Sequence, residues 1–112
     1  MDLREYPGRR VIVVMDRPLG SRHPDHGFDY PVNYGHLLSI EAADREAIDA
    51  YYLGLDGPVE RAEGEVIAVV HRLHDDDDKV VVVPQGMQLS DQEIKDAVAF
   101  QEQWFEHCVV RG

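Results

Sequence analysis

Short hydrophobic runs separated by polar, turn-forming segments are the main pattern along the chain. The runs at 9–16, 36–40, 49–55, 65–73 and 80–83 are rich in β-branched or aromatic residues and have the lengths of strands. Residues 17–29 contain two prolines, two glycines and no hydrophobic period, which predicts a loop. Residues 41–47 fit a helical turn or an irregular loop equally well. The pattern therefore indicates a mainly β protein.

Two turns organise the predicted strands. Asp56-Gly57-Pro58 ends the strand at 49–55, and we expect residues 59–62 to pair with that strand across the turn. The strands at 65–73 and 80–83 are joined by the polar segment 74–79, so they should form a hairpin with an acidic tip.

A helix is predicted near the end of the chain. Ser90 and Glu93 have the spacing of a capping box, in which each side chain bonds the other residue's backbone N–H. The helix should then present one face to the sheet, formed by Ile94, Ala97, Val98, Gln101, Phe105 and Cys108. The aromatic residues Phe100, Trp104 and Phe105 predict core packing or an oligomer contact, and not a ligand-binding cluster. The fold class we expect is α+β, mainly β: one domain over 1–112, a small barrel or curled sheet closed by this helix.

The net charge of the chain limits the classes of binding partner that we expect. The chain has 22 acidic and 11 basic residues, for a formal net charge of −11. Such a chain should repel nucleic acid and anionic membranes, so we expect neither as a partner. A phosphate-bearing substrate would need bound cations to reverse the local field. The single cysteine, Cys108, excludes an internal disulfide framework, and no signal peptide or apolar span opens the sequence, so we expect a cytoplasmic protein.

The stretch from Tyr30 to Leu53 concentrates the candidate chemistry. Tyr30 and Tyr34 flank a proline and an asparagine, and three acids follow at 44, 46 and 49, just before or at the start of a predicted strand. Carboxylates near phenols suit an oxygen-ligand site for a hard divalent cation. A solvated polar loop between two strands is the alternative.

These residues resemble soluble family I inorganic pyrophosphatases, most closely the short bacterial proteins related to them. Residues 30–35, Tyr-Pro-Val-Asn-Tyr-Gly, match that family's Tyr-Pro-x-Asn-Tyr-Gly segment, and 44–49 stand where the family has Asp-Gly-Asp-Pro-x-Asp. The acidic hairpin before Lys79 and the Trp-Phe-Glu-His segment at 104–107 also fit. The resemblance runs from about residue 11 to residue 107.

The resemblance implies a five-stranded OB-like barrel with a packed helix, and Mg²⁺-dependent hydrolysis of pyrophosphate to two phosphates, with Mn²⁺ as an alternative ion. It implies Glu46, Asp49 and Lys79 as the catalytic set, with Glu46 polarising the attacking water. It also implies metal ligands and phosphate-binding residues: Asp44, Asp49, Asp75, Asp77 and Asp16 for metal, and Tyr30, Tyr34 and Lys79 for phosphate. A homo-oligomer is compatible with the family.

Several positions depart from the family pattern. The loop after Asp16 is short and lacks the family's arginine, which Arg17, Arg22 or His23 could replace. Arg45 and Ala47 replace a glycine and a proline of the metal loop, and the family's Tyr-Lys phosphate clamp is replaced at 108–109. Metal ligands are therefore retained better than phosphate ligands.

Other interpretations of the same residues stay open. The chain could be a non-catalytic module that binds metal or phosphate, a structural domain, or a hydrolase of another phosphoanhydride or phosphoester. The acids at 75–78 could serve only to keep the hairpin tip solvated, and Lys79 could only balance them. His23 and His26 lack the cysteine partners and third ligand typical of a zinc site, although His23 could donate to a phosphate or carry a proton.

Overall fold

The computed structural model describes residues 3–25, 27–38 and 47–111. In these segments the chain forms six strands and one helix: β1 (Arg10–Arg17), β2 (Asn33–Leu37), β3 (Asp49–Tyr52), β4 (Arg61–Arg72), β5 (Lys79–Val83), α1 (Asp91–Glu102) and β6 (His107–Val110). Within that described part, no helix combines the length and apolar character needed to cross a bilayer.

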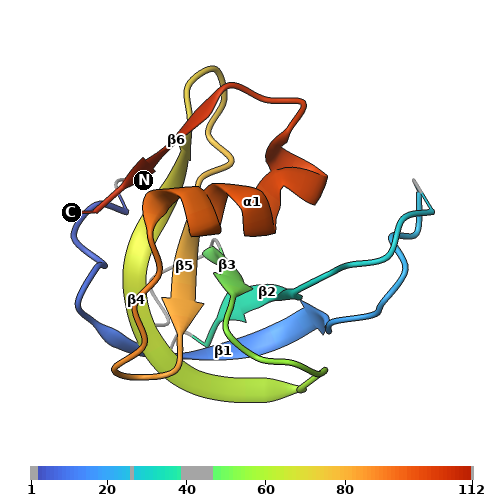
Figure 1. Ribbon diagram of the computed structural model, residues 1–112, viewed down its shortest axis with the longest axis horizontal. Coiled ribbons are helices and arrows are strands. Elements are labelled where there is room, and N and C mark those ends of the chain that lie inside the picture. Colours follow the sequence, from blue (N-terminus) through green and yellow to red (C-terminus); the bar gives the residue numbers. More distant parts are fainter. Residues whose placement is uncertain (1–2, 26, 39–46, 112) are drawn as a thin grey trace.

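Five of the strands close into a barrel. The sheet order is β1-β2-β3-β5-β4-β6, and β1 also pairs with β4, which closes the ring and leaves β6 as an extra strand beside β4. All neighbouring strands are antiparallel except β3 and β5. Helix α1 lies across the outside of β4 and β5 (Figure 1). The mainly β, OB-like barrel with a C-terminal helix is therefore confirmed.

Strand β4 makes the closure possible because it is long and curved (Figure 1). Its first half pairs with β1, with Ala62 opposite Val13, and its second half pairs with both β5 and β6. The register against β5 shifts between Val66 and Ala68, and such a bulge increases local bending. Residues 61–62 thus belong to β4 and pair with β1, so the predicted pairing of 59–62 with the strand at 49–55 is wrong.

Alternation along the strands divides the apolar side chains between two cores. In β5, Val80 and Val82 point into the barrel, whereas Val81 and Val83 pack outward under the helix. Burial on both faces explains why this strand reads as an unbroken valine run. The outer core includes Ile94 and Val98 of α1, so the predicted inner face of the helix is confirmed at these two positions.

The helix begins as expected and ends earlier than expected. Ser90 accepts a hydrogen bond from the backbone N–H of Glu93, and the Glu93 side chain accepts one from the backbone N–H of Ser90. However, α1 ends at Glu102, so the prediction that Phe105 and Cys108 share its buried face is wrong. Cys108 lies in β6, opposite His71 of β4. The apolar period continues past residue 102, but β-branched residues after Cys108 suit an edge strand better than a helix.

Smaller differences concern strand limits. The strand predicted at 36–40 begins earlier, at Asn33, so half of the Tyr-Pro-Val-Asn-Tyr-Gly segment is in β2; residues 39 and 40 lie outside the described part. Strand β3 ends at Tyr52 instead of residue 55. Most of the undecided segment 41–47 also lies outside the described residues.

Candidate functional site

Asn33 anchors the motif at 30–35 by its side chain. It is fully buried, and its Oδ1 accepts hydrogen bonds from the backbone N–H groups of Leu19 (2.9 Å) and Val59 (3.3 Å). Its Nδ2 donates to the carbonyl of Gly57 at 3.1 Å. One amide therefore ties the loop after β1 and the turn after β3 to the start of β2, and it fixes where the flanking tyrosines lie.

Tyr34 and Asp49 form the centre of a cluster of charged groups. The hydroxyl of Tyr34 on β2 lies beside the carboxylate of Asp49, the first residue of β3, and the two groups shift each other's pKa. Burial raises the pKa of Asp49, and the nearby carboxylates of Asp77 and Asp16 raise it further, whereas Tyr34 and Lys79 oppose the rise. Burial and the charges of Asp49 and Asp77 likewise raise the pKa of Tyr34. The groups thus share a region with excess negative charge.

The carboxylates at the acidic hairpin tip have different hydrogen-bond and ion-pair partners. Asp75 Oδ1 accepts from the backbone N–H of Asp77 at 2.8 Å, and Asp78 Oδ1 accepts from the backbone N–H of Arg72 at 2.9 Å. Asp78 Oδ2 also lies 2.8 Å from His71 Nδ1. These bonds shape the turn, whereas Asp77 Oδ2 faces Arg72 (3.2 Å) and Lys79 (3.3 Å). Asp77 is therefore the acid of the tip that joins the cluster around Asp49.

Lys79 is buried, and its ammonium group is held by the protein. Its Nζ donates to the carbonyl of Asp77 at 3.0 Å and lies 3.1 Å from Glu102 Oε2, with 1% of its side chain exposed. Glu102 is fully buried on α1. Lys79 thus lies on the same side of the barrel as Asp49 and Asp77, paired with a carboxylate from the helix.

Besides its ion pair with Lys79, Glu102 accepts hydrogen bonds from two residues. Arg72 donates through Nε (2.9 Å) and a terminal nitrogen (3.3 Å), and the Tyr51 hydroxyl donates at 2.6 Å. Burial alone would raise the pKa of Glu102, but the bonds from Arg72 and Tyr51 and the charge of Lys79 outweigh burial and lower it. The carboxylate is therefore ionised and fixes two cations at the base of the cluster.

A hydrogen-bond chain connects this buried carboxylate to Tyr30. The Tyr30 hydroxyl donates to Gln101 Oε1 at 3.2 Å, Gln101 Nε2 donates to the Tyr51 hydroxyl at 2.8 Å, and Tyr51 donates to Glu102. The hydroxyl group of Tyr30 is thus oriented by a protein acceptor, Gln101, whereas that of Tyr34 lies beside Asp49.

A pocket of about 670 Å³ opens beside the cluster. Arg72 lies in its wall, with the guanidinium carbon 3.8 Å from the ring centroid of Phe105, a cation–π arrangement. Trp104 (66% exposed) and Phe105 (42% exposed) also line it, so core packing is wrong for these two residues, whereas an oligomer contact stays a prediction; Phe100 is half-buried and packs against Tyr30 and Tyr51. The remaining lining residues are His23, Phe28, Tyr30, Tyr34, Asp77 and Gln101.

The other sequence-predicted residues lie around this centre. Asp16, at the end of β1, has its carboxylate 2.8 Å from His36 Nδ1. Arg17 is close enough to Tyr30 to oppose the rise that burial causes in the pKa of Tyr30. Arg22 is exposed, pairs with Asp29 at 3.6 Å and does not line the pocket. Asp44 and Glu46 lie outside the described residues.

The donor chemistry fits a hard cation, although the described residues do not form a complete ligand set. Among residues 3–25, 27–38 and 47–111, no group of three His, Cys, Asp or Glu side chains is arranged to hold a metal ion. The oxygen donors and the excess negative charge around Asp49 are nevertheless what Mg²⁺ or Mn²⁺ prefers. Burial is the main cause of the raised pKa of Asp49, and bound cations would relieve the further rise that the carboxylates of Asp77 and Asp16 add.

Glu102 and Arg72 are the charged site residues that sequence reasoning missed among the described residues. The available signal for Glu102 was its spacing: it lies four residues after Val98 and eight after Ile94, on the buried face of α1. Arg72 ends β4 just after a run of apolar residues at 66–70, which is a common place for a surface cation. Nothing in the sequence identified these two residues as partners.

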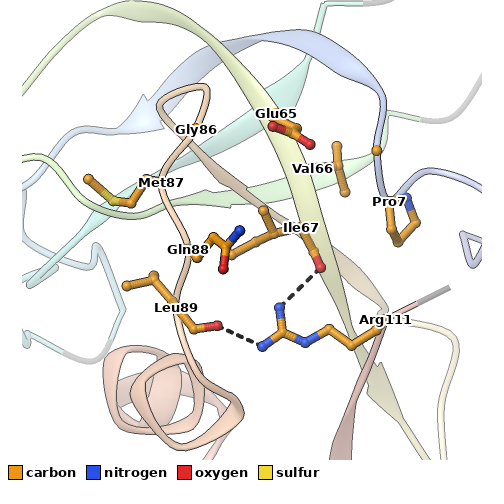
Figure 2. A pocket seen from close by; sticks show the side chains of 10 residues that line it. Pro7, Glu65, Val66, Ile67, Gly86, Met87, Gln88, Leu89 and Arg111 are labelled. Atoms are coloured by element: carbon orange, nitrogen blue, oxygen red, sulfur yellow. Dashed lines mark hydrogen bonds between the residues drawn. The ribbon is translucent and has the colours of Figure 1, made fainter.

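A second pocket, of about 480 Å³, lies between β4 and the segment before α1. Figure 2 shows that the Arg111 guanidinium spans this pocket, donating to the carbonyls of Ile67 (3.2 Å) and Leu89 (2.7 Å). Arg111 also pairs with Asp91 at 2.8 Å. Its bonds link β6 to the helix and to β4, and we assign this cation a structural role.

Comparisons with known proteins identify the fold. No family model matches the sequence, and no curated protein matches it. Among solved structures, the inorganic pyrophosphatase of Ehrlichia chaffeensis superposes with a TM-score of 0.66 at 14% identity, covering 94% of this chain and 87% of that one. The enzyme from Helicobacter pylori gives 0.62 at 15% identity (95% and 85%), and that from Neisseria gonorrhoeae gives 0.57 at 23% identity (86% and 77%). The chain therefore has the fold of the bacterial inorganic pyrophosphatases, as the resemblance of its motifs predicts.

Proposed function

We propose that the protein is a Mg²⁺-dependent phosphoanhydride hydrolase of the inorganic pyrophosphatase kind, with Mn²⁺ as an alternative ion. One observation carries the proposal: residues from three separate parts of the sequence, Tyr34, Asp49 and the pair Asp77 and Lys79, lie together on a pyrophosphatase-like barrel. The simplest substrate of this class is inorganic pyrophosphate.

The metal-binding part of the proposal uses the acidic cluster. Asp49 and Asp77 are its described core, with Asp16 and Asp75 at its edge; Asp44 is added from the sequence. Bound ions would neutralise the substrate's charge and lower the pKa of a coordinated water. Without such ions, a chain of charge −11 would repel a polyanion.

The protein's own groups would position the reactants. Tyr34 lies beside the Asp49 carboxylate and favours its ionised form, and Lys79 is fixed by Asp77 and Glu102. In the proposal Glu46 polarises the attacking water, and Lys79, Tyr30, Tyr34, Arg17 and Arg22 contribute to phosphate binding. Catalysis of phosphoryl transfer depends mainly on such positioning and charge neutralisation.

A non-catalytic binding module is a second candidate, because the buried cations already have protein partners. Lys79 and Arg72 both bond Glu102, so part of the positive charge that a phosphate would use is already compensated. Calorimetry would then detect binding of pyrophosphate in the presence of Mg²⁺, whereas an activity assay would detect no release of phosphate.

Phosphate release from inorganic pyrophosphate, measured with and without Mg²⁺, tests the proposal. Wild type should turn over only with the ion, and Asp49→Asn should lower kcat/KM about 100-fold, because it removes the charge of a proposed metal ligand, and losing even a group that only supports such a ligand costs about 10–100-fold. Asparagine keeps an acceptor for Tyr34, so the loss reports on charge. Asp56→Asn is the matched control, because it removes an acid from the turn after β3, outside the cluster.

Two results would contradict the hydrolase. One is turnover that Asp49→Asn leaves unchanged, and the other is binding of pyrophosphate with Mg²⁺ and no release of phosphate. We further propose a cytoplasmic location and a homo-oligomeric state, the latter to be measured by light scattering.

A further inference from the structure

The pocket beside the acidic cluster has a lining that inorganic pyrophosphate would not use. Six of its nine lining residues carry aromatic rings: His23, Phe28, Tyr30, Tyr34, Trp104 and Phe105. Its volume of about 670 Å³ is in the range of sites for organic ligands. Inorganic pyrophosphate is small and polar throughout, so it gains nothing from an aromatic wall.

The rings form a supported platform. His23 and Tyr30 are nearly parallel, with centroids 6.0 Å apart and 7° between the planes, and Tyr30 and Tyr34 are 5.7 Å apart at 26°. Phe28 and Phe100 meet Tyr30 at steeper angles, 47° and 72°, and hold it from the side. Tyr30 is itself 4% exposed, so it supports the half-buried rings of His23, Phe28 and Tyr34 around it. These rings are fixed in place before a ligand arrives, which lowers the entropy cost of binding a planar group.

The rim of the pocket exposes two more aromatic side chains. Trp104 is 66% exposed and Phe105 is 42% exposed, directly after the end of α1. One face of Phe105 is covered by the Arg72 guanidinium. A tryptophan that lines a pocket and remains mostly exposed offers a broad stacking surface to a ligand.

The pocket and the acidic cluster share side chains. Tyr34 and Asp77 line the pocket and also belong to the group of charges around Asp49. A ligand whose phosphates lie with cations at Asp49 and Asp77 would therefore extend its other end over the rings. Such a ligand needs a phosphate chain at one end and a planar, apolar-faced group at the other.

We propose that this pocket binds the base of a nucleoside diphosphate or triphosphate, so that the protein's substrate class is the nucleoside polyphosphates. The base stacks on the aromatic wall and the rim tryptophan, and the phosphates lie at the acidic cluster with their Mg²⁺. Base–aromatic stacking tolerates different bases, because every base has a π-face. The hydrolytic step rests on the function proposed above, whereas the binding step does not.

The reaction balances with water as the only co-reactant. For ADP, the oxygen of one water bonds to the terminal phosphorus and the bond from that phosphorus to the bridging oxygen breaks. The bridging oxygen stays with the nucleoside monophosphate, the terminal group leaves as orthophosphate, and one proton is released to solvent near neutral pH.

Binding of ADP with Mg²⁺ tests the inference. Trp104 is the chain's single tryptophan, so its fluorescence reports a base at the rim directly. By calorimetry, ADP should bind at least about tenfold more tightly than inorganic pyrophosphate, and Trp104→Ala should lower the ratio of the two affinities about tenfold. Trp104→Phe should recover most of that ratio. Leu73→Ala, which removes a 50% exposed apolar side chain outside the pocket, should leave both affinities unchanged.

The outcomes separate this inference from the proposed function. If inorganic pyrophosphate is hydrolysed with Mg²⁺ but ADP binds no more tightly, or if Trp104→Ala leaves the ratio unchanged, the inference is overturned and the hydrolase stands. If ADP quenches Trp104 and the ratio depends on residue 104 while no phosphate is released, the base pocket stands and the hydrolase is overturned.

Discussion

At the scale of single residues, Glu102 controls the positive charge of the candidate site. Its carboxylate bonds Arg72, Lys79 and Tyr51 from a fully buried position. Removing one partner of a buried ion pair leaves the others uncompensated, which costs more than the pair itself contributes. Glu102 is thus a positioning residue, because it acts on the site through Lys79 and Arg72.

Glu102→Gln should lower the free energy of unfolding at pH 7 by about 3 kcal/mol, because the buried cations Arg72 and Lys79 lose the carboxylate that neutralises them. The pKa of Glu102 is lowered by folding, so its stabilisation is present above the pKa of the unfolded carboxyl and is lost as pH falls through the folded value. The variant should therefore lose less stability than wild type on acidification. Urea unfolding at several pH values measures both effects.

Glu106→Gln is the control for that variant. Glu106 pairs with His74 at 3.0 Å, but both side chains are more than 70% exposed, so its loss should change stability by under about 0.5 kcal/mol. If acidification lowers the free energy of unfolding of wild type and of Glu102→Gln by the same amount, the role assigned to Glu102 is refuted.

The sequence indicates some of these residues and not others for a physical reason. Tyr34 and Asp49 could be predicted because they lie within or near a short motif, where local spacing reflects the site. Glu102 and Arg72 are thirty residues apart and meet only through the packing of α1 on β4. Likewise, the apolar period around Trp104 predicts burial, but the chain leaves the helix at residue 102 and exposes that ring.

At the scale of elements, strand alternation and turn residues predict most of the barrel. The hairpin of β4 and β5 and the capping box of α1 follow from local sequence alone. The closure of β1 on β4 and the addition of β6 depend on contacts between distant segments, which no local pattern encodes. The wrong prediction for residues 59–62, which were expected to pair with the strand at 49–55, arises from such a contact between distant segments.

The close contact between β1 and β2 explains why the motif at 30–35 ends in a glycine, Gly35. It is buried in β2, opposite Met15 of β1 and Ala50 of β3. A Cβ at this position would overlap the carbonyl oxygen of Val14 and lie 2.7 Å from Met15 Cα. Because these are backbone atoms, the strands would have to separate to relieve the contact.

Gly35→Ala should therefore lower the free energy of unfolding by about 1–3 kcal/mol, the usual cost of overpacking. Chemical denaturation measures the change. Gly57→Ala is the matched control, because a Cβ added there would meet no atom within 4 Å and the backbone does not adopt a positive φ. Equal effects of the two substitutions would show that β1 and β2 are not in such close contact.

At the scale of the whole molecule, the charge of −11 opposes compactness, and part of the repulsion is concentrated at the site. The raised pKa of Asp49 means that its ionised form is less favourable in the folded chain, so its contribution to stability falls as pH rises above the pKa of the unfolded carboxyl. At neutral pH without divalent ions, Asp49→Asn should for this reason have a higher Tm than wild type.

Salt and Mg²⁺ should then act differently on the two proteins. NaCl should raise the Tm of both, because screening at 0.1 M limits charge interactions to about 10 Å. At equal ionic strength, MgCl₂ should raise the Tm of wild type further, by about 10 °C at a hundredfold excess over Kd, because ligand binding to the folded state adds about 2.7 kcal/mol. Asp49→Asn should lose most of that additional rise, whereas Asp56→Asn should keep it. If Mg²⁺ and NaCl at matched ionic strength stabilise wild type equally, the acidic cluster is a region of diffuse charge and holds no specific ion.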